Sequence, residues 1–381
     1  MFTYEFLQNY WWFIVALLGG LLVFLLFVQG ANAMILLMGA DEREKQLMVN
    51  STGRKWEFTF TTLVTFGGAF FASFPLFYST SFGGAYWVWV LILVTFVLQA
   101  VSYEFQNRTG NIIGRTAFRV FLALNGFLAP LLIGTAVGTF FTGSDFTVNK
   151  AAAGDSLMPV ISSWGNGWHG LEAVANLWNV SFGLMVVGLA VCLGLMYMIN
   201  NIDDEALVQK MRRRLVVSGV VFLVFFLNTA AGLLTMDGFA VAEDGTVYME
   251  RYKYLHNFLQ MPAVLAVFLA GTVLVLWGLA GTVACRNFRR GIWPAGAGTV
   301  LVVMAVLMVA GYNGTAYYPS TADLQSSLTI ANSCSSEFTL RTMAYVSFVI
   351  PFVLAYIVFA WRAMDRRPLT SEELENTEHK Y

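Results

Sequence analysis

The sequence is poor in charged residues and in histidine. Only 12% of its 381 residues are Asp, Glu, Lys or Arg, compared with about 25% in an average soluble domain. None of the three histidines falls within a long apolar run: His169, His256 and His379. Haem and copper centres at membrane depth are commonly held by histidine, so we expect this chain to hold neither. The core subunit of a haem-copper oxidase, which needs several such histidines, is thereby excluded.

Other common signs of chemistry are also missing. The three cysteines are scattered, so they predict neither a metal site nor a disulfide framework: Cys192, Cys285 and Cys334. The sequence contains no phosphate-binding loop and no dinucleotide fingerprint. Glycine pairs occur, but small residues in membrane helices typically permit close packing: Gly19-Gly20, Gly67-Gly68 and Gly83-Gly84. The net charge of −1 carries little information, and we expect no nucleic acid among the partners.

What the sequence has in quantity is hydrophobic residues, which make up 57% of it and gather in long runs. A helix needs about 20 mainly apolar residues to cross the hydrocarbon core of a membrane. Nine runs are long enough: 11–38, 58–82, 86–106, 117–142, 173–199, 215–237, 258–284, 291–312 and 340–361. The strands of a membrane barrel would instead alternate apolar and polar residues. The sequence therefore predicts an all-α integral membrane protein with nine transmembrane helices, a single membrane domain over residues 1–381.

Lysine and arginine are distributed unevenly between the two sides of these helices. Most of them lie in the connections after helices one, three, five and seven and in the tail after helix nine. The opposite side carries only four: Lys150, Arg251, Lys253 and Arg341. Since basic connections stay in the cytoplasm, the N-terminus is predicted outside and the C-terminus in the cytoplasm. No basic residue precedes the first apolar run, so we expect no cleavable signal peptide.

Ionisable residues at membrane depth are costly and therefore tend to be functional. Two carboxylates stand out: Glu57, beside Trp56 at the start of helix two, and Glu104, near the end of helix three. Both lie toward the predicted cytoplasmic side, which indicates a path for proton uptake. The alternative is a purely structural role. The helix dipole favours Glu57 near a helix N-terminus, and Glu104 can pair with Arg108 one turn later.

Amide side chains extend this candidate site. Gln29 and Asn32 lie three residues apart and so share one face of helix one. Because helices one and two are antiparallel neighbours, we expect these amides to approach Glu57 and the hydroxyls of Thr61 and Thr62. Together these residues would form a polar pocket open to the cytoplasm.

Several stretches, in order along the chain, resemble one known family. They are Gly67–Pro75, Pro130–Gly134, Tyr318–Ser320, Ser327–Asn332 and Pro368–Leu374, with Pro351 inside helix nine. These motifs are similar to those of subunit II of the cytochrome bd quinol oxidases. They are independent of one another and run from helix two to the tail, and the nine-helix topology agrees with them.

This resemblance implies a function that composition does not show. Complexes of this family oxidise quinol and reduce dioxygen to water in the bacterial cytoplasmic membrane, and they take protons from the cytoplasm. Two b-type haems and one d-type haem belong to subunit I, whereas subunit II binds none, stabilises its partner and helps to conduct protons. Quinol and lipid are further partners, small accessory subunits occur, and some members hold a structural quinone in subunit II.

The resemblance also implies how the helices are grouped. Two four-helix bundles are expected, helices one to four (about 11–142) and five to eight (about 173–312), followed by a peripheral helix nine (about 340–361) and a cytoplasmic tail (362–381). The alternative function is a stand-alone secondary transporter. Transporters often show paired repeats with matched helix interruptions, and no such match is visible in this sequence.

Three site residues carry over from the resemblance, and two stretches depart from it. One of these lies in helix one, and the other directly follows Glu57, where the family's Gly-Asn-x-Val-Trp pattern is replaced by Phe58-Thr59-Phe60-Thr61-Thr62. Trp56-Glu57 falls where the family has a Trp-Asp pair at the mouth of its proton channel, and Glu104 falls where the family often has a Phe-Asp-Tyr run. The family's Asp-Gly-Phe-Asp run in helix one is here Gln29-Gly30-Ala31-Asn32. An amide cannot titrate, although it can hydrogen-bond a water molecule. We therefore expect that the proton path is either rerouted or depends more heavily on Glu57.

Overall fold

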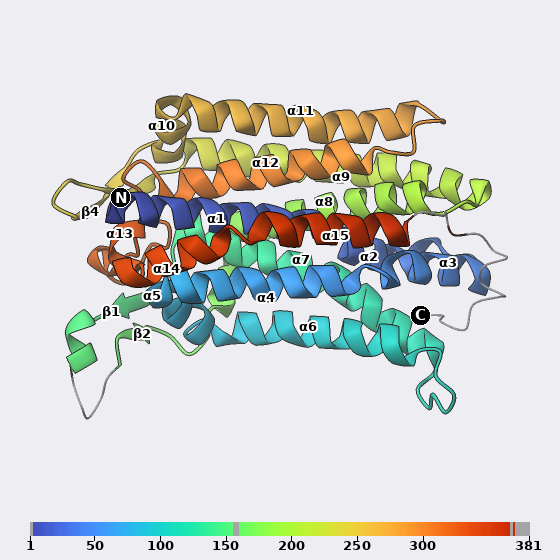
Figure 1. The fold of residues 1–381 in the computed structure, drawn as a ribbon, viewed down its shortest axis with the longest axis horizontal. Coiled ribbons are helices and arrows are strands. Elements are labelled where there is room, and N and C mark those ends of the chain that lie inside the picture. Colours follow the sequence, from blue (N-terminus) through green and yellow to red (C-terminus); the bar gives the residue numbers. More distant parts are fainter. Residues whose placement is uncertain (1–2, 155–159, 366–368, 370–381) are drawn as a thin grey trace.

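The computed structural model describes residues 3–154, 160–365 and 369. Its long helices run side by side, so that their ends gather at two opposite ends of the molecule (Figure 1). One end, which we call the strand end, carries two antiparallel pairs of strands: β1 (Phe146–Val148) with β2 (Ser162–Trp164), and β3 (Gly238–Val241) with β4 (Val247–Glu250). The opposite end, which we call the basic end, carries α3 (Glu42–Gly53) and the connections 106–113, 202–204 and 285–291. The four connections that were predicted to share one side of the membrane thus lie together.

The remaining helices are, in chain order, α1 (Tyr4–Leu25), α2 (Phe27–Met38), α4 (Trp56–Ser73), α5 (Pro75–Phe77), the π-helix η1 (Tyr78–Gly83), α6 (Tyr86–Phe105), α7 (Gly114–Thr142), α8 (Leu177–Asn201), α9 (Glu205–Thr235), α10 (Lys253–Gln260), α11 (Pro262–Ala284), α12 (Ile292–Gly311), α13 (Ile330–Ser333), α14 (Glu337–Ser347) and α15 (Ile350–Met364). Three short 3₁₀ turns lie among the strand-end loops: η2 (Lys150–Gly154), η3 (Leu171–Ala175) and η4 (Leu324–Ser326).

Seven spans within the described residues are long and apolar enough to cross a membrane without interruption. They coincide with seven of the nine predicted runs. The first of them, Tyr4–Met38, contains both α1 and α2 across a turn at Leu26. The number reaches nine if each of two bent helix pairs counts as one span. The structure is mostly helical, as predicted, but it also contains four short strands, and the two bent spans differ from their predicted shape.

The second predicted span, 58–82, is not one continuous helix. α4 ends at Ser73, and the chain bends by 117° into α5 and η1. Pro75 explains the break, because a proline disfavours helical backbone in the residue before it. Phe74 accordingly leaves the helical region, with φ −131° and ψ 65°. The rest of the predicted span forms a separate turn at the strand end.

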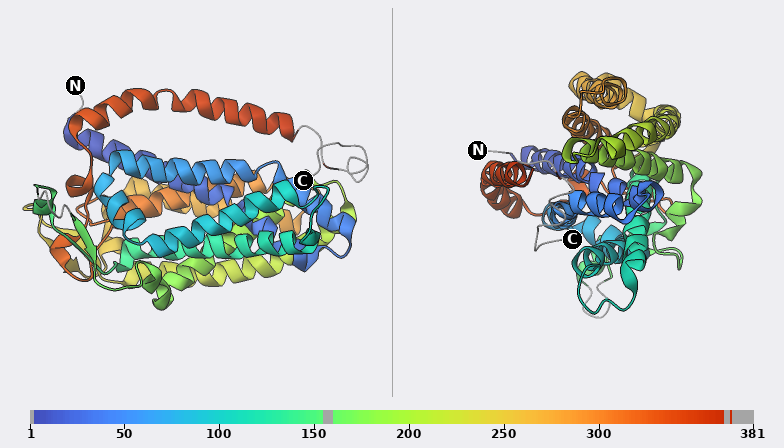
Figure 2. Two further views of the ribbon diagram at one scale, coloured as in Figure 1. Left: turned by 90° about the horizontal axis from the view of Figure 1, so that it is seen from below. Right: turned by 90° about the vertical axis from the view of Figure 1, so that its right-hand side faces the viewer.

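The ninth predicted span, 340–361, consists of α14 and α15, which meet at 41°. Pro351 lies in the first turn of α15, where its missing N–H does no harm. The two helices run along one side of the bundle (Figure 2). Of the side chains in α15, a helix described throughout, only Trp361 is buried. Lipid or another protein must cover so exposed a helix.

Helix α8 is the centre of the bundle and packs against α2, α7 and α9. Of its most apolar stretch, 89% is buried, against 22% for α9 and for α11. Glycine allows the closest approach. A Cβ atom added to Gly30 of α2 would lie 1.8 Å from the carbonyl oxygen of Ala190 in α8. The two backbones therefore touch directly at this crossing.

The glycine pairs serve packing at some positions and not at others. A Cβ atom on Gly20 would lie 2.7 Å from the carbonyl oxygen of Val300 in α12, so the predicted packing role is confirmed there. Gly68 and Gly83 have no atom of this chain within 4 Å of such a Cβ.

A buried ion pair fixes the basic end of α15. Lys55 Nζ lies 2.9 Å from Asp365 Oδ1, and the lysine side chain is fully buried. The same carboxylate accepts hydrogen bonds from the Tyr197 hydroxyl and the Asn201 amide, both at 3.3 Å. The ammonium group also lies over the ring of Trp361, 5.4 Å from its centroid. These contacts attach the peripheral helix to α8 and to the start of α4.

Changing Asp365 to asparagine should release this end of α15. The substitution leaves the Lys55 ammonium group buried without a counter-charge, and breaking a buried pair costs about 3–5 kcal/mol. Because α15 lies at the edge, its end can detach and expose the lysine to water. We expect faster proteolysis of residues 350–365 in the assembled protein. The double variant Lys55→Met/Asp365→Leu should restore most of the protection, and a wild-type cleavage rate for Asp365→Asn would contradict the account.

Candidate functional site

Glu57 and Thr61 do not lie on the face of α4 that packs against α1. Thr59 is buried on that face, and its hydroxyl donates to the carbonyl oxygen of Leu25 at 2.9 Å. A residue two positions away on a helix points about 200° around the axis. Glu57 and Thr61 consequently point away from α1, and both are exposed in this chain. This corrects the predicted pocket, because neither residue reaches Gln29 or Asn32.

The predicted residues Asn32 and Trp56 meet instead around Tyr103 of α6. The Tyr103 hydroxyl donates to Asn32 Oδ1 at 2.5 Å and lies 2.8 Å from the hydroxyl of Thr52 in α3. The indole of Trp56 stacks on the Tyr103 ring, with the ring centroids 6.2 Å apart and an interplanar angle of 11°. Asn32, Thr52 and Tyr103 are all buried. Four helices thus contribute to one polar contact near the basic end.

A second buried polar layer contains Gln29. Its Nε2 donates to Gln99 Oε1 of α6 at 2.8 Å and to Asn125 Oδ1 of α7 at 3.4 Å. Gln29 precedes Asn32 by three residues and Gln99 precedes Tyr103 by four, so the two layers lie one helical turn apart. We call the six residues of both layers the polar ladder: Asn32, Thr52, Tyr103, Gln29, Gln99 and Asn125.

Four amide atoms of the polar ladder are buried and have no hydrogen-bond partner among the described residues: Gln29 Oε1, Asn32 Nδ2, Gln99 Nε2 and Asn125 Nδ2. Buried polar groups in native proteins pair with protein or with ordered water. These atoms therefore mark places where the ladder can bind water molecules.

Glu104 follows Tyr103 in the sequence but is exposed. The expected ion pair with Arg108 is not formed in the described structure. Arg108 Nε donates to the main-chain carbonyl oxygen of Glu104 at 3.4 Å. The carboxylates of Glu57 and Glu104 therefore both lie on the surface of this chain, each next to a member of the stacked pair Trp56–Tyr103.

Another charged contact closes the basic end beside the ladder. The Arg119 side chain is 2% exposed, and its Nη1 donates to both carboxylate oxygens of Glu42, at 2.8 and 2.7 Å. This pair joins α7 to α3, the helix that carries Thr52.

Sequence reasoning missed Tyr103, Thr52, Gln99 and Asn125. The amides at 99 and 125 did give a signal, since each is an isolated polar residue within a predicted span and such residues are costly in a membrane. Thr52 gave none, because it lies in a polar connection. Nothing in the sequence showed that Tyr103 would turn inward while Glu104 turns outward.

Two of the three histidines, His169 and His256, lie away from the polar ladder, at the strand end. His169 Nδ1 lies 3.1 Å from the carbonyl oxygen of Gly84, and His256 Nδ1 lies 2.8 Å from Glu250 Oε1. His379 is outside the described residues. Within the described residues, no three His, Cys, Asp or Glu side chains are grouped so as to hold a metal ion.

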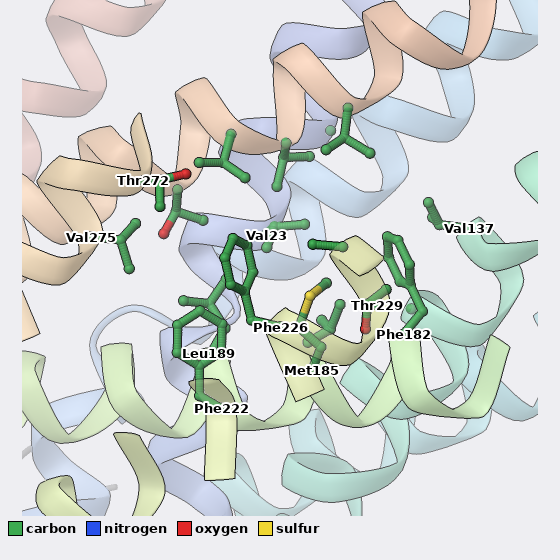
Figure 3. A pocket seen from close by; sticks show the side chains of 18 of the residues that line it. Val23, Val137, Phe182, Met185, Leu189, Phe222, Phe226, Thr229, Thr272 and Val275 are labelled. Carbon is green, nitrogen blue, oxygen red and sulfur yellow. The ribbon is translucent and has the colours of Figure 1, made fainter. Parts of the chain in front are cut away.

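An apolar cavity of about 120 Å³ lies among α1, α7, α8, α9, α11 and α12 (Figure 3). Aliphatic and aromatic side chains make up most of its wall, among them Val23, Met185 and Phe226. Thr229 and Thr272 also line it, but each hydroxyl donates to a carbonyl oxygen of its own helix, at 2.5 and 2.8 Å. The cavity therefore suits a hydrocarbon chain and offers no hydroxyl donor from these threonines.

Known proteins are similar to this chain along almost its whole length. Residues 7–364 match the family described as cytochrome bd terminal oxidase subunit II. The chain is 26% identical over 394 residues to the cytochrome bd-I ubiquinol oxidase subunit 2 of Escherichia coli (strain K12), covering 100% of this chain and 99% of the relative. It is 24% identical over 382 residues to the cytochrome bd ubiquinol oxidase subunit 2 of Bacillus subtilis (strain 168), covering 96% and 99%.

A solved structure has a similar fold. The bd oxidase from Geobacillus thermodenitrificans gives a TM-score of 0.59 at 11% identity, covering 96% of this chain and 98% of that chain. The family match extends from the first long helix to the last residue of α15, which sets aside the transporter alternative. The chain belongs to the cytochrome bd terminal oxidase subunit II family and is a multi-pass subunit of an oxidoreductase complex in the bacterial inner membrane.

Proposed function

We propose that this chain is the non-haem subunit II of a bd-type oxidase that oxidises quinol and reduces dioxygen to water, and that it stabilises the haem-bearing subunit I. The family match over residues 7–364 is the observation that carries the proposal. The relatives from E. coli and B. subtilis are both subunits of ubiquinol oxidases. In this proposal the two b-type haems and the d-type haem are bound by subunit I, and they supply the chemistry of dioxygen reduction.

Proton uptake is proposed to begin at Glu57. This carboxylate lies at the basic end on a face of α4 that the chain leaves exposed, next to the stacked pair Trp56–Tyr103. A partner subunit that covers this face would enclose the carboxylate. Behind the pair, the polar ladder continues inward, and water bound to its amides can pass protons although the amides do not titrate. Glu104 provides a second surface carboxylate beside the same pair.

The proposed topology puts the basic end in the cytoplasm and the N-terminus outside. The four basic connections that gather at one end support it. The proposed division into two four-helix bundles and a peripheral helix has support in the packing. α1 contacts α4 and α12, while α2 contacts α7 and α8. In that division, the first span forms the contact between the bundles.

For a structural quinone in this chain, we propose a binding place for the isoprenoid tail only. The apolar cavity can take part of an isoprenoid chain, since its wall is hydrocarbon and aromatic (Figure 3). The hydroxyls of the three lining threonines, Thr229, Thr272 and Thr299, donate to carbonyl oxygens of their own helices, so they are not available as donors to a quinone carbonyl oxygen. The quinone head group would have to lie outside it. Small accessory subunits remain a proposal from the resemblance alone.

Changing Tyr103 to phenylalanine tests the polar ladder. The variant removes the hydroxyl that joins Asn32 to Thr52, while the ring can still stack on Trp56. A lost buried hydrogen bond costs about 1–3 kcal/mol, so the complex should assemble with a slightly lower midpoint of thermal unfolding. Quinol-driven oxygen consumption should fall severalfold at unchanged haem content.

Tyr254→Phe is the matched control, because it removes a buried tyrosine hydroxyl near the strand end, bonded to the carbonyl oxygen of Phe141 at 3.3 Å. This variant should lose stability without losing turnover. Equal losses of turnover in the two variants would remove the ladder from the proposed path.

A further inference from the structure

Two arginines of α9 have no partner in the part of the chain that the structure describes. Arg213 and Arg214 are exposed, and neither forms a hydrogen bond or ion pair with a described residue. Most nearby cations are paired: Lys210 with Glu44, Arg286 with Glu205 and Arg289 with Asp203. The two guanidinium groups are therefore available to an anion from outside the described chain.

Both arginines line a hollow of about 360 Å³ between the end of α2 and α9. Its other lining residues are Leu37, Met38, Lys210 and Val217. The hollow thus joins two unpaired guanidinium groups, and the Lys210 ammonium group that is paired with Glu44, to an apolar floor. A guanidinium group matches the geometry of phosphate oxygens and can bind two of them at once.

The position of the two arginines along α9 matches the level expected for a membrane surface. α9 continues from Arg214 to Thr235, which is a rise of about 32 Å at about 1.5 Å per residue. The hydrocarbon core of a bilayer is about 30 Å thick. If the other end of α9 lies at the opposite surface, the guanidinium groups lie at the level of the lipid head groups.

An exposed apolar stripe runs from the hollow toward the strand end. Val217, Val220, Val224 and Leu227 follow Arg213 at spacings of four, three, four and three residues, so they share one face of α9. Each of these four side chains is between 57% and 64% exposed. An acyl chain can lie along this stripe from a head group held in the hollow.

We propose that this hollow binds an anionic phospholipid from the membrane leaflet at the basic end. Its phosphate would lie between Arg213 and Arg214, and one acyl chain would lie on the exposed apolar stripe of α9. Charge favours an anionic lipid such as phosphatidylglycerol over zwitterionic phosphatidylcholine, whose trimethylammonium group would lie close to Arg213 and Arg214. Basic pockets between membrane helices are a known mode of recognition for such head groups. The site is separate from the polar ladder and adds a lipid-binding role to this subunit.

Native mass spectrometry of the detergent-purified complex tests the proposal, with added phosphatidylglycerol or phosphatidylcholine as the probe. Wild-type complex should retain phosphatidylglycerol in preference to phosphatidylcholine. Each guanidinium near anionic lipid contributes about fivefold in affinity, so Arg213→Gln/Arg214→Gln should bind phosphatidylglycerol about 25-fold more weakly. The matched control is Arg115→Gln/Arg290→Gln, which removes two exposed charges at the same end but outside the hollow, and it should bind like wild type.

Several results would overturn the proposal. Equal binding of the two lipids, or equal binding by the two double variants, would show that the hollow does not select the head group. Displacement of the lipid by millimolar inorganic phosphate would indicate a site for a free anion. The tail 370–381 carries four glutamates. If phosphatidylglycerol bound only to a variant that ends at Leu369, the occupant would be the tail of the chain itself.

Discussion

Changing Glu57 to glutamine is expected to slow quinol-driven oxygen consumption by about tenfold or more while the complex and its haems remain assembled. Glutamine has nearly the same shape but cannot release a proton, and a positioned acid–base group typically contributes about 10²–10⁴-fold to a rate. The side chain is exposed in this chain, so the change leaves no buried charge and should cost little stability. The measurement is oxygen consumption per haem across a range of pH.

Two further variants make the Glu57 result specific. Glu57→Asp keeps a titratable group and should retain most of the activity, since the family carries aspartate at the corresponding position. Glu243→Gln removes an exposed carboxylate near the strand end and should have no effect. Wild-type turnover of Glu57→Gln at every pH tested would remove this residue from the mechanism.

Changing Gly30 to alanine should strongly destabilise the assembled protein. The added Cβ atom would lie 1.8 Å from the carbonyl oxygen of Ala190, and a backbone atom cannot rotate aside as a side chain can. α2 and α8 would have to separate at the centre of the bundle. Overpacking costs about 1–3 kcal/mol and sometimes more, and we expect at least the upper end. The yield of assembled complex and its midpoint of thermal unfolding are the measurements.

Gly68→Ala is the control for this substitution. No atom of the chain lies within 4 Å of a Cβ atom at that position, and alanine favours a helix over glycine by about 1 kcal/mol. It should therefore match or exceed the stability of the wild-type chain. A Gly30→Ala complex that assembles and melts like wild type would show that α2 and α8 can move apart without cost.

The apolar helices, and the gathering of the basic connections at one end of the molecule, could be predicted because a membrane constrains the sequence of the helices that cross it. Each helix must satisfy its own backbone hydrogen bonds over the hydrocarbon thickness, so each leaves an apolar run, and the basic connections gather at one end as expected. The bend after α4 was less visible. Pro75 marks a break, but the apolar run continues past it to residue 82.

The rotation of each helix could not be predicted in the same way. The polar residues of α4 are spread around the helix, so composition did not show that Thr59 would face α1 and that Glu57 would face outward. Contacts such as that of Phe66 with Gly19 decide this rotation, and they depend on shapes rather than on polarity. The same holds for Tyr103 and Glu104, which are adjacent in sequence yet lie inside and outside the bundle.

The most direct test of the account is to purify this chain in mild detergent from its native membrane and record a reduced-minus-oxidised absorption spectrum. We expect a haem-bearing membrane partner to co-purify, with b-type and d-type bands. The same chain expressed without that partner should show no haem band. A preparation free of haem and partner, or a stoichiometric haem band from this chain alone, would contradict its assignment as the non-haem subunit of a bd-type oxidase.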